Sequence, residues 1–165
     1  MRIDLVFYYM LMLMFLSSTS VAALDFFAAD SDQPLEISSR QLEVFQEQQK
    51  SVFSGDVVAE QGEMTLHTDM LTVIFDGQND VRRIEATGAV RINDPIRNAR
   101  GDHAVFDRDE ETLIISGNAV VVQGDNRISG DEIILFIGQN RSLVRSKDSG
   151  RVRAVILPEP KPEEP

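Results

Sequence analysis

The chain of 165 residues contains no cysteine and no tryptophan, and its only tyrosines are Tyr8 and Tyr9. Without cysteine there can be no disulfide, no thiolate metal site and no cysteine nucleophile. Basic residues are also scarce, because 16 Lys and Arg stand against 27 Asp and Glu, a net charge of −11. This balance argues against a nucleic-acid-binding protein, since phosphate backbones repel net negative charge. Apolar residues make up 42% of the chain, which excludes wholesale disorder.

The N-terminus has the pattern of a secretory signal. Arg2 opens a short polar region, an apolar run of 12 residues extends from Leu5 to Leu16, and small residues end at Ala23. Such a run is too short to span a bilayer, which needs about 20 residues, but it fits a signal peptide. We predict that residues 1–23 are cleaved off. The alternative is a retained anchor, if the following residues extend the apolar run.

At the other end, residues 158–165 alternate proline with charged residues. Proline lacks the N–H that helices and sheets use, and this segment has nothing to bury. We expect residues 158–165 to form an extended tail, so that a single domain spans residues 24–157.

The middle of the chain is built from a repeat. Ser or Thr followed by Gly recurs with glycine spacings of 33, 29 and 33, at Ser54-Gly55, Thr87-Gly88, Ser116-Gly117 and Ser149-Gly150. An aspartate follows three of these glycines at a constant offset of 14, as Asp69, Asp102 and Asp131. Arg40 takes the aspartate's place in an N-terminal half-repeat. The pattern indicates an array of similar units that begins and ends within a unit.

Within each unit, apolar and polar residues alternate with a period of two, which indicates β-strands. Val, Ile, Thr and Phe dominate these runs, and turn-forming residues separate them. We predict an all-β fold with no convincing helix, except for a loop or short turn at the Gln- and Glu-rich end of the stretch from Leu42 to Lys50. The main positions predicted to face inward are Val57, Ala59, Leu66, Leu71, Val73, Phe75, Val90, Ile92, Ala104, Phe106, Ala119, Val121, Ile133 and Leu135.

The spacing of the inward positions predicts a bend in each strand. They lie three residues before and two after each aspartate, an odd spacing that strict alternation does not allow. A β-bulge or sheet corner shifts the pleat by one residue, and Gly101 and Gly130 directly precede two of the aspartates. We therefore expect strands that bend between two facing sheets, as in a sandwich or open jelly roll. The aspartates would then cap backbone N–H groups at the corners.

Three short elements occur in a fixed order: Thr87–Ile92, Gly101–Phe106 and Ser116–Val120, and Gly130–Ile133 repeats the second. In order and spacing they resemble the LptA/OstA family of periplasmic lipopolysaccharide-transport proteins. The resemblance covers about Leu35 to Leu157. It implies a twisted β jelly roll, open at both ends, whose apolar interior binds the acyl chains of lipid A. The inward residues named above would then be the lipid-binding residues.

The resemblance also implies partners. Subunits of the family stack head to tail, and the stack bridges an inner-membrane lipopolysaccharide-transport complex to an outer-membrane lipopolysaccharide translocon. The energy comes from an ATPase elsewhere, so that this component is expected not to be an enzyme. The residues themselves show no phosphate-binding loop before a helix and no convincing metal-ligand cluster, so we expect no cofactor and no metal.

The charge of the chain is divided unevenly. Residues 24–80 contain 12 acids and 2 bases, a net charge of −10, whereas residues 81–157 contain 11 acids and 12 bases, a net charge of +1. In a repeat array, position in the sequence maps onto position along the axis. An acidic start and a basic end would be complementary in head-to-tail self-association; the alternative is a merely solvated charge bias.

Other interpretations remain open. The inward residues could be an ordinary sandwich core, and the fold could serve a structural or glycan-binding module. Trp is absent and Tyr occurs only within the predicted signal peptide, which disfavours a glycan-binding surface. A glycan-processing enzyme would need paired carboxylates facing a cleft. Within the family, the membrane-anchored inner-membrane subunit is a further candidate. His67 and His103 we interpret as plain surface positions on strands.

Overall fold

A single antiparallel β-sheet contains most of the described residues, which in this computed structural model are 33–139, 141–147 and 150–157. The predicted signal peptide and the predicted tail lie outside these ranges. Within them, no helix has the length and apolar character needed to cross a membrane.

Ten strands and two short 3₁₀ helices follow one another along the described chain. They are β1 (Leu35–Ser38), β2 (Gln41–Phe45), η1 (Gln46–Gln48), β3 (Lys50–Gln61), β4 (Met64–Phe75), β5 (Val81–Asn93), β6 (Arg97–Asp107), β7 (Thr112–Gln123), β8 (Asn126–Phe136), η2 (Ile137–Gln139), β9 (Arg141–Arg145) and β10 (Arg153–Val155). The predicted all-β fold is therefore confirmed. In the stretch from Leu42 to Lys50, the polar end is the short turn η1, whereas its first residues belong to β2.

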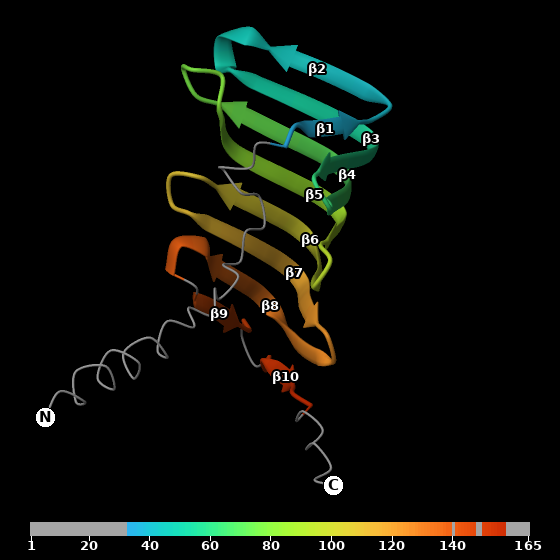
Figure 1. Cartoon of the computed structure of the whole chain (residues 1–165), viewed down its shortest axis with the longest axis vertical. Coiled ribbons are helices and arrows are strands. Elements are labelled where there is room, and N and C mark those ends of the chain that lie inside the picture. The colour runs from blue at the N-terminus through green and yellow to red at the C-terminus, as the bar shows by residue number, and fades with distance from the viewer. Residues whose placement is uncertain (1–32, 140, 148–149, 158–165) are drawn as a thin grey trace, which may run out of the picture.

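The strands are stacked in the order in which they occur in the chain. From β3 to β8, strands of 11 to 13 residues each pair with the next. Strands β1 and β2 both pair with β3, and β9 and β10 both pair with β8. The N-terminal strands thus lie at one end of the stack and the C-terminal strands at the other (Figure 1). Position along the chain therefore maps onto position along the axis, as predicted.

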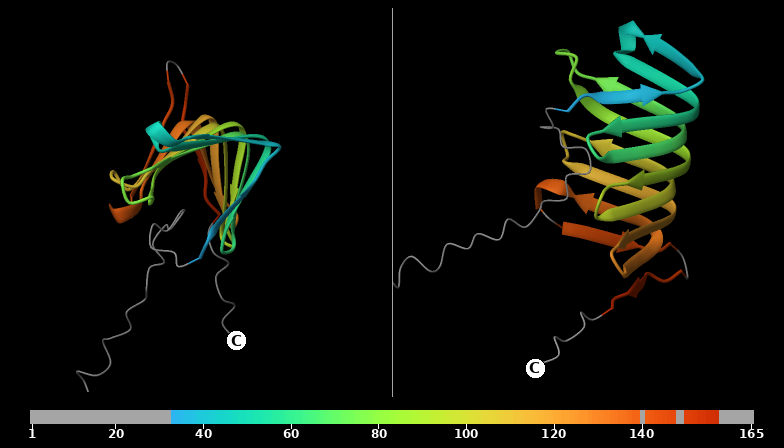
Figure 2. Two further views of the ribbon diagram at one scale, coloured as in Figure 1. Left: turned by 90° about the horizontal axis from the view of Figure 1, so that it is seen from above. Right: turned by 45° about the vertical axis from the view of Figure 1, so that its right-hand side comes forward.

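Each long strand bends in its middle, so that the sheet forms a V when viewed along the stack (Figure 2, left). We call the two halves the first arm and the second arm. The first arm comprises β2, β9 and residues 50–54, 70–75, 81–87, 103–107, 112–116 and 132–136. The second arm comprises β1, β10 and residues 57–61, 64–68, 90–93, 97–101, 119–123 and 126–130. The two facing layers are halves of one sheet, because each long strand runs through the bend.

The bend is built by a glycine and its successor on alternate strands. Strands β3, β5 and β7 each place two residues opposite one residue of the next strand, which is a β-bulge. Both residues have positive φ: Gly55 (+81°) and Asp56 (+47°), Gly88 (+88°) and Ala89 (+45°), Gly117 (+74°) and Asn118 (+54°). Glycine adopts this conformation freely, whereas for a residue with a side chain the left-handed conformation costs about 1–2 kcal/mol of conformational free energy. This requirement explains the recurring glycine.

The repeated aspartates pack against these glycines. A Cβ atom added at Gly88 would lie 2.8 Å from the Cβ of Asp69, and one added at Gly117 would lie 2.7 Å from the Cβ of Asp102. Both distances are shorter than any ordinary contact between carbon atoms. The aspartate and the glycine of neighbouring strands therefore form one interlocked corner.

The corner aspartates differ in their hydrogen bonds. The Asp131 carboxylate accepts a 2.6 Å hydrogen bond from the backbone N–H of Lys147, so the predicted capping role is confirmed there. The Asp102 carboxylate instead accepts one from the side-chain amide of Asn118, at 3.2 Å. At the first corner, Arg40 replaces the aspartate and its guanidinium pairs with the Asp56 carboxylate.

Replacing Gly117 with alanine is expected to destabilise the fold by about 2 kcal/mol or more. The new methyl group would collide with Asp102. The alanine would also have to adopt a positive φ, which is unfavourable for an L-residue with a side chain. Urea unfolding of Gly117→Ala measures the loss. Gly77→Ala is the matched control, because a Cβ there meets nothing within 4 Å, and it should change stability by less than about 1 kcal/mol. Equal losses in the two variants would contradict the proposed role of the corner.

Candidate functional site

The inward faces of the two arms meet in one apolar cluster. Of the 14 residues predicted to face inward, 12 belong to this cluster, and Phe75 and Val121 are partly buried against it. The burial prediction is therefore confirmed. Burial alone does not test whether these residues bind a lipid.

The predicted set omits six members of the cluster. They are Met64, Ile84, Ala86, Ala99, Leu113 and Ile115. Four of these lie two and four residues before the glycines at 88 and 117. The same alternation, read backward from each glycine, would have found them. Ala99 lies three residues before Asp102, a position that the corner spacing did predict to face inward, although it is not among the 14 named residues.

The cluster is closed to solvent along most of its length. Leu71, Ile115 and Ala119 have no exposed surface, and Val57 and Val90 are 1% exposed. Several members are alanines, which fill little space. The inward face is thus a continuous apolar layer across six strands, filled by side chains of small and medium size.

Among the residues that the structure describes, three polar side chains are buried, and each lies at a corner or a rim. The Thr68 hydroxyl, at a corner, lies 2.9 Å from the carbonyl oxygen of Thr87 and can donate to it. Thr112 lies at the rim of the first arm. Arg97 lies at the rim of the second arm, where its guanidinium is 3.2 Å from the Asp94 carboxylate. The one charged side chain of the three, Arg97, thus lies away from the bend and beside an opposite charge, which offsets the cost of its burial.

Ion pairs link the turns along the rim of the first arm. They include Arg82 with Asp109 (2.7 Å), Arg83 with Asp107 (3.0 Å) and Arg108 with Asp76 (2.8 Å). The backbone N–H groups of Gln78 and Asp80, followed by the Arg108 guanidinium, lower the pKa of the Asp76 carboxyl. The folded turn therefore favours the ionised form of the Asp76 side chain. These pairs join residues that are 24 to 32 positions apart in the sequence.

Neither histidine belongs to a metal site in the described part of the chain. His67 and His103 are exposed on the outer face. Throughout the described ranges, no group of three or more His, Cys, Asp or Glu side chains is placed to hold a metal ion. The outward positions of both histidines agree with their interpretation as surface residues.

The two ends of the stack expose apolar residues and differ in charge. At the β2 end, Leu42 is 52% and Val44 is 60% exposed. At the other end, Val155, Ile156 and Leu157 are 46%, 74% and 56% exposed. The basic residues of the C-terminal end are Arg141, Arg145, Lys147, Arg151 and Arg153. Each end also carries strands with an unpaired edge.

Known proteins share this chain's sequence pattern and fold. Escherichia coli (strain K12) lipopolysaccharide export system protein LptA is 25% identical over 152 residues, 86% of this chain and 82% of that protein. An uncharacterised protein of Rhizobium meliloti (strain 1021) is 29% identical over 112 residues, which span 62% of this chain and 60% of that protein.

A solved structure has the same fold. It is LptH, the LptA-homologous periplasmic component of the lipopolysaccharide transport device of Pseudomonas aeruginosa, with a TM-score of 0.68 and 20% identity. The match covers 79% of this chain and all of that one. Residues 36–141 match the family model described as LptA/(LptD N-terminal domain) LPS transport protein. With its repeated corners and apolar inward face, this chain belongs to that family of LPS transport proteins.

Proposed function

We propose that this protein is a periplasmic carrier that shields the acyl chains of lipopolysaccharide (LPS) between its two arms and passes the lipid from the inner to the outer membrane. The continuous apolar inward face across β3 to β8 is the observation that carries the proposal. Membership of the LPS transport family supports the substrate class. The resemblance to the periplasmic LptA-like proteins supports the compartment.

Acyl chains are suited to this face by size and chemistry. Each CH₂ group removed from water contributes roughly 0.8 kcal/mol, so a lipid with several chains cannot remain exposed to the periplasm. The inward face consists of aliphatic and aromatic side chains with alanines between them. Such a surface excludes water without specifying the shape of one chain. A carrier must also release its cargo, which favours many weak contacts over a tight pocket.

Lipid entry has to separate the arms, because the inward side chains are already buried against one another. Acyl chains would replace the contacts that the arms lose, so that the apolar area kept from water changes little. The ion pairs at the rim of the first arm tie its turns together, so this arm would move as a unit.

The carrier role requires no bond-making residue. Apolar side chains hold the lipid by contact alone. The lipid can move along the stack if the inward face of one subunit continues into that of the next. We assign the energy source to an ATPase outside this chain. An N-terminal signal peptide, cleaved after Ala23, would deliver the protein to the periplasm.

The ends of the stack support head-to-tail self-association, and equivalent contacts would join the bridge to its inner-membrane and outer-membrane partners. Unpaired strand edges at both ends offer backbone N–H and C=O groups for pairing with another chain. Exposed apolar residues lie beside those edges. The opposite charge bias of the two ends would favour one direction of stacking.

A charge on the inward face is expected to abolish LPS binding. Phe75 is a suitable site because it is only partly buried, so Phe75→Glu should keep the fold. A carboxylate that faces acyl chains without a partner is strongly unfavourable. We expect the affinity of purified protein for LPS to fall at least about tenfold, a loss of about 1.4 kcal/mol.

The matched control for this experiment is Ile74→Glu, which places the same charge on the outward face of the same strand. It should retain nearly full LPS binding. Circular dichroism establishes that both variants are folded. Full LPS binding by a folded Phe75→Glu protein would overturn the assignment of the inward face.

Self-association is expected to weaken as salt rises. If opposite charges orient the stack, screening them should reduce association about tenfold between low and high ionic strength. Sedimentation velocity at several sodium chloride concentrations measures this dependence. Stacking that does not respond to salt would contradict the electrostatic part of the proposal.

A further inference from the structure

A row of side chains crosses the outer face of the second arm, away from the inward face. Arg91 of β5 lies directly opposite Arg100 of β6, which lies opposite Val120 of β7, which lies opposite Ser129 of β8. Neighbouring strands are about 4.8 Å apart, so the Cβ atoms of directly opposite residues are about 5 Å apart. The row thus places two exposed arginine side chains on the same face of neighbouring strands.

These two arginines have no acidic partner among the described residues. None of the ion pairs there involves Arg91, Arg100 or the nearby Arg151. On the first arm, by contrast, Arg82 and Arg108 each pair with an aspartate. Like charges directly opposite each other on a sheet destabilise it. An anion that bridges the two guanidinium groups would remove this repulsion.

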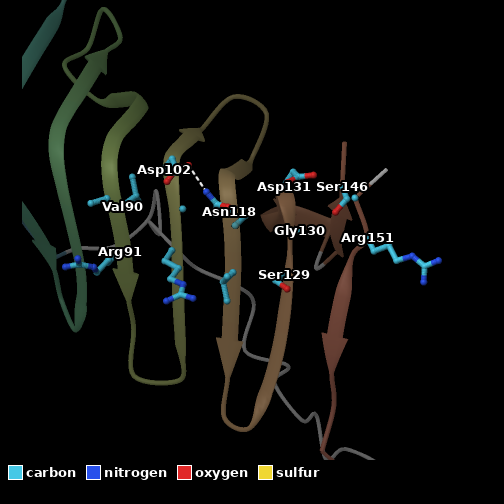
Figure 3. A pocket seen from close by; sticks show the side chains of 15 residues that line it. Val90, Arg91, Asp102, Asn118, Ser129, Gly130, Asp131, Ser146 and Arg151 are labelled. Carbon is cyan, nitrogen blue, oxygen red and sulfur yellow. Dashed lines mark hydrogen bonds between the residues drawn. The ribbon is translucent and has the colours of Figure 1, made fainter. Parts of the chain in front are cut away.

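The row borders a hollow of about 560 Å³ on the outer side of the bend (Figure 3). Val120 is 7% exposed and forms an apolar part of its wall. Ser129 and Ser146 add hydroxyl groups, and Arg151 lies at the edge of the hollow with its side chain directed away from it (Figure 3). A hollow of this volume accommodates a small molecule.

The hollow has two chemically different sides. Arg91 and Arg100 lie on strands of the second arm. Asp102 and Asp131 lie at the corners, apart from Arg91 (Figure 3). Guanidinium groups bind phosphate oxygens, and carboxylates accept hydrogen bonds from hydroxyl groups. A simple anion would satisfy only the first side. A ligand with a phosphate at one end and hydroxyl groups at the other would satisfy both.

We propose that this outer hollow binds a phosphorylated sugar, with the phosphate on Arg91 and Arg100 and the sugar hydroxyl groups toward Asp102 and Asp131. The site is separate from the inward face, so this inference does not rest on the proposed lipid carriage. Either assignment can fail without the other.

Thermal unfolding of the full chain tests the proposal with glucose 1-phosphate as the probe. At constant ionic strength, about 10 mM glucose 1-phosphate should raise Tm, because a ligand that binds only the folded state stabilises it. Glucose should have no effect, and inorganic phosphate should bind at least about fivefold more weakly than glucose 1-phosphate. No rise in Tm with glucose 1-phosphate, or equal affinity for inorganic phosphate, would overturn the proposal.

The double variant Arg91→Gln/Arg100→Gln identifies the site. It should bind glucose 1-phosphate at least about tenfold more weakly. Lys50→Gln/Arg141→Gln removes the same charge from the first arm, where both cations lie over phenylalanine rings, and should bind like the unchanged protein. Equal binding by both double variants would overturn the assignment.

Amide chemical-shift mapping on the unchanged protein provides a measurement that requires no substitution. Glucose 1-phosphate should shift the backbone resonances of Arg91, Arg100 and Ser129. Shifts confined to other strands would overturn the proposal.

Discussion

The structure depends on one backbone constraint, the pair of left-handed residues that begins with glycine on every second long strand. At Gly88 and Gly117, the neighbouring aspartate occupies the space that a side chain would need. The bulge turns each strand through the bend while the sheet remains continuous. Because the same device recurs along the stack, the bends align and one sheet forms two facing arms.

Alignment of the bends separates the molecule into surfaces with different chemistry. Inward side chains gather from both arms into one apolar layer, and buried charge is kept to the rim, where Arg97 meets Asp94. The ends keep unpaired edges, since no closure of the sheet removes them. Lipid carriage between the arms and stacking through the ends would therefore use separate surfaces of one fold.

Much of this fold could be predicted from the sequence, because its period of two and its repeat are local patterns. The odd spacing around Asp69 and Asp102 predicted the bend. The alternation of apolar and polar residues does not show which strands pair, so it could not predict that both layers belong to one sheet. For the same reason the facing of Arg91 and Arg100 escaped prediction, since their opposition is set by register between strands. Met64 was missed because it is the first residue of β4, beside a turn, and lies farther from Asp69 than the repeated positions used for the prediction.

The central claim is that the inward face contacts lipid acyl chains. Site-specific photocrosslinking in LPS-producing cells tests it most directly, with the photoreactive residue at inward Phe106 or at its outward neighbour Val105. The account predicts LPS adducts from position 106 and few or none from position 105. Equal labelling from both positions, or labelling from position 105 alone, would contradict it.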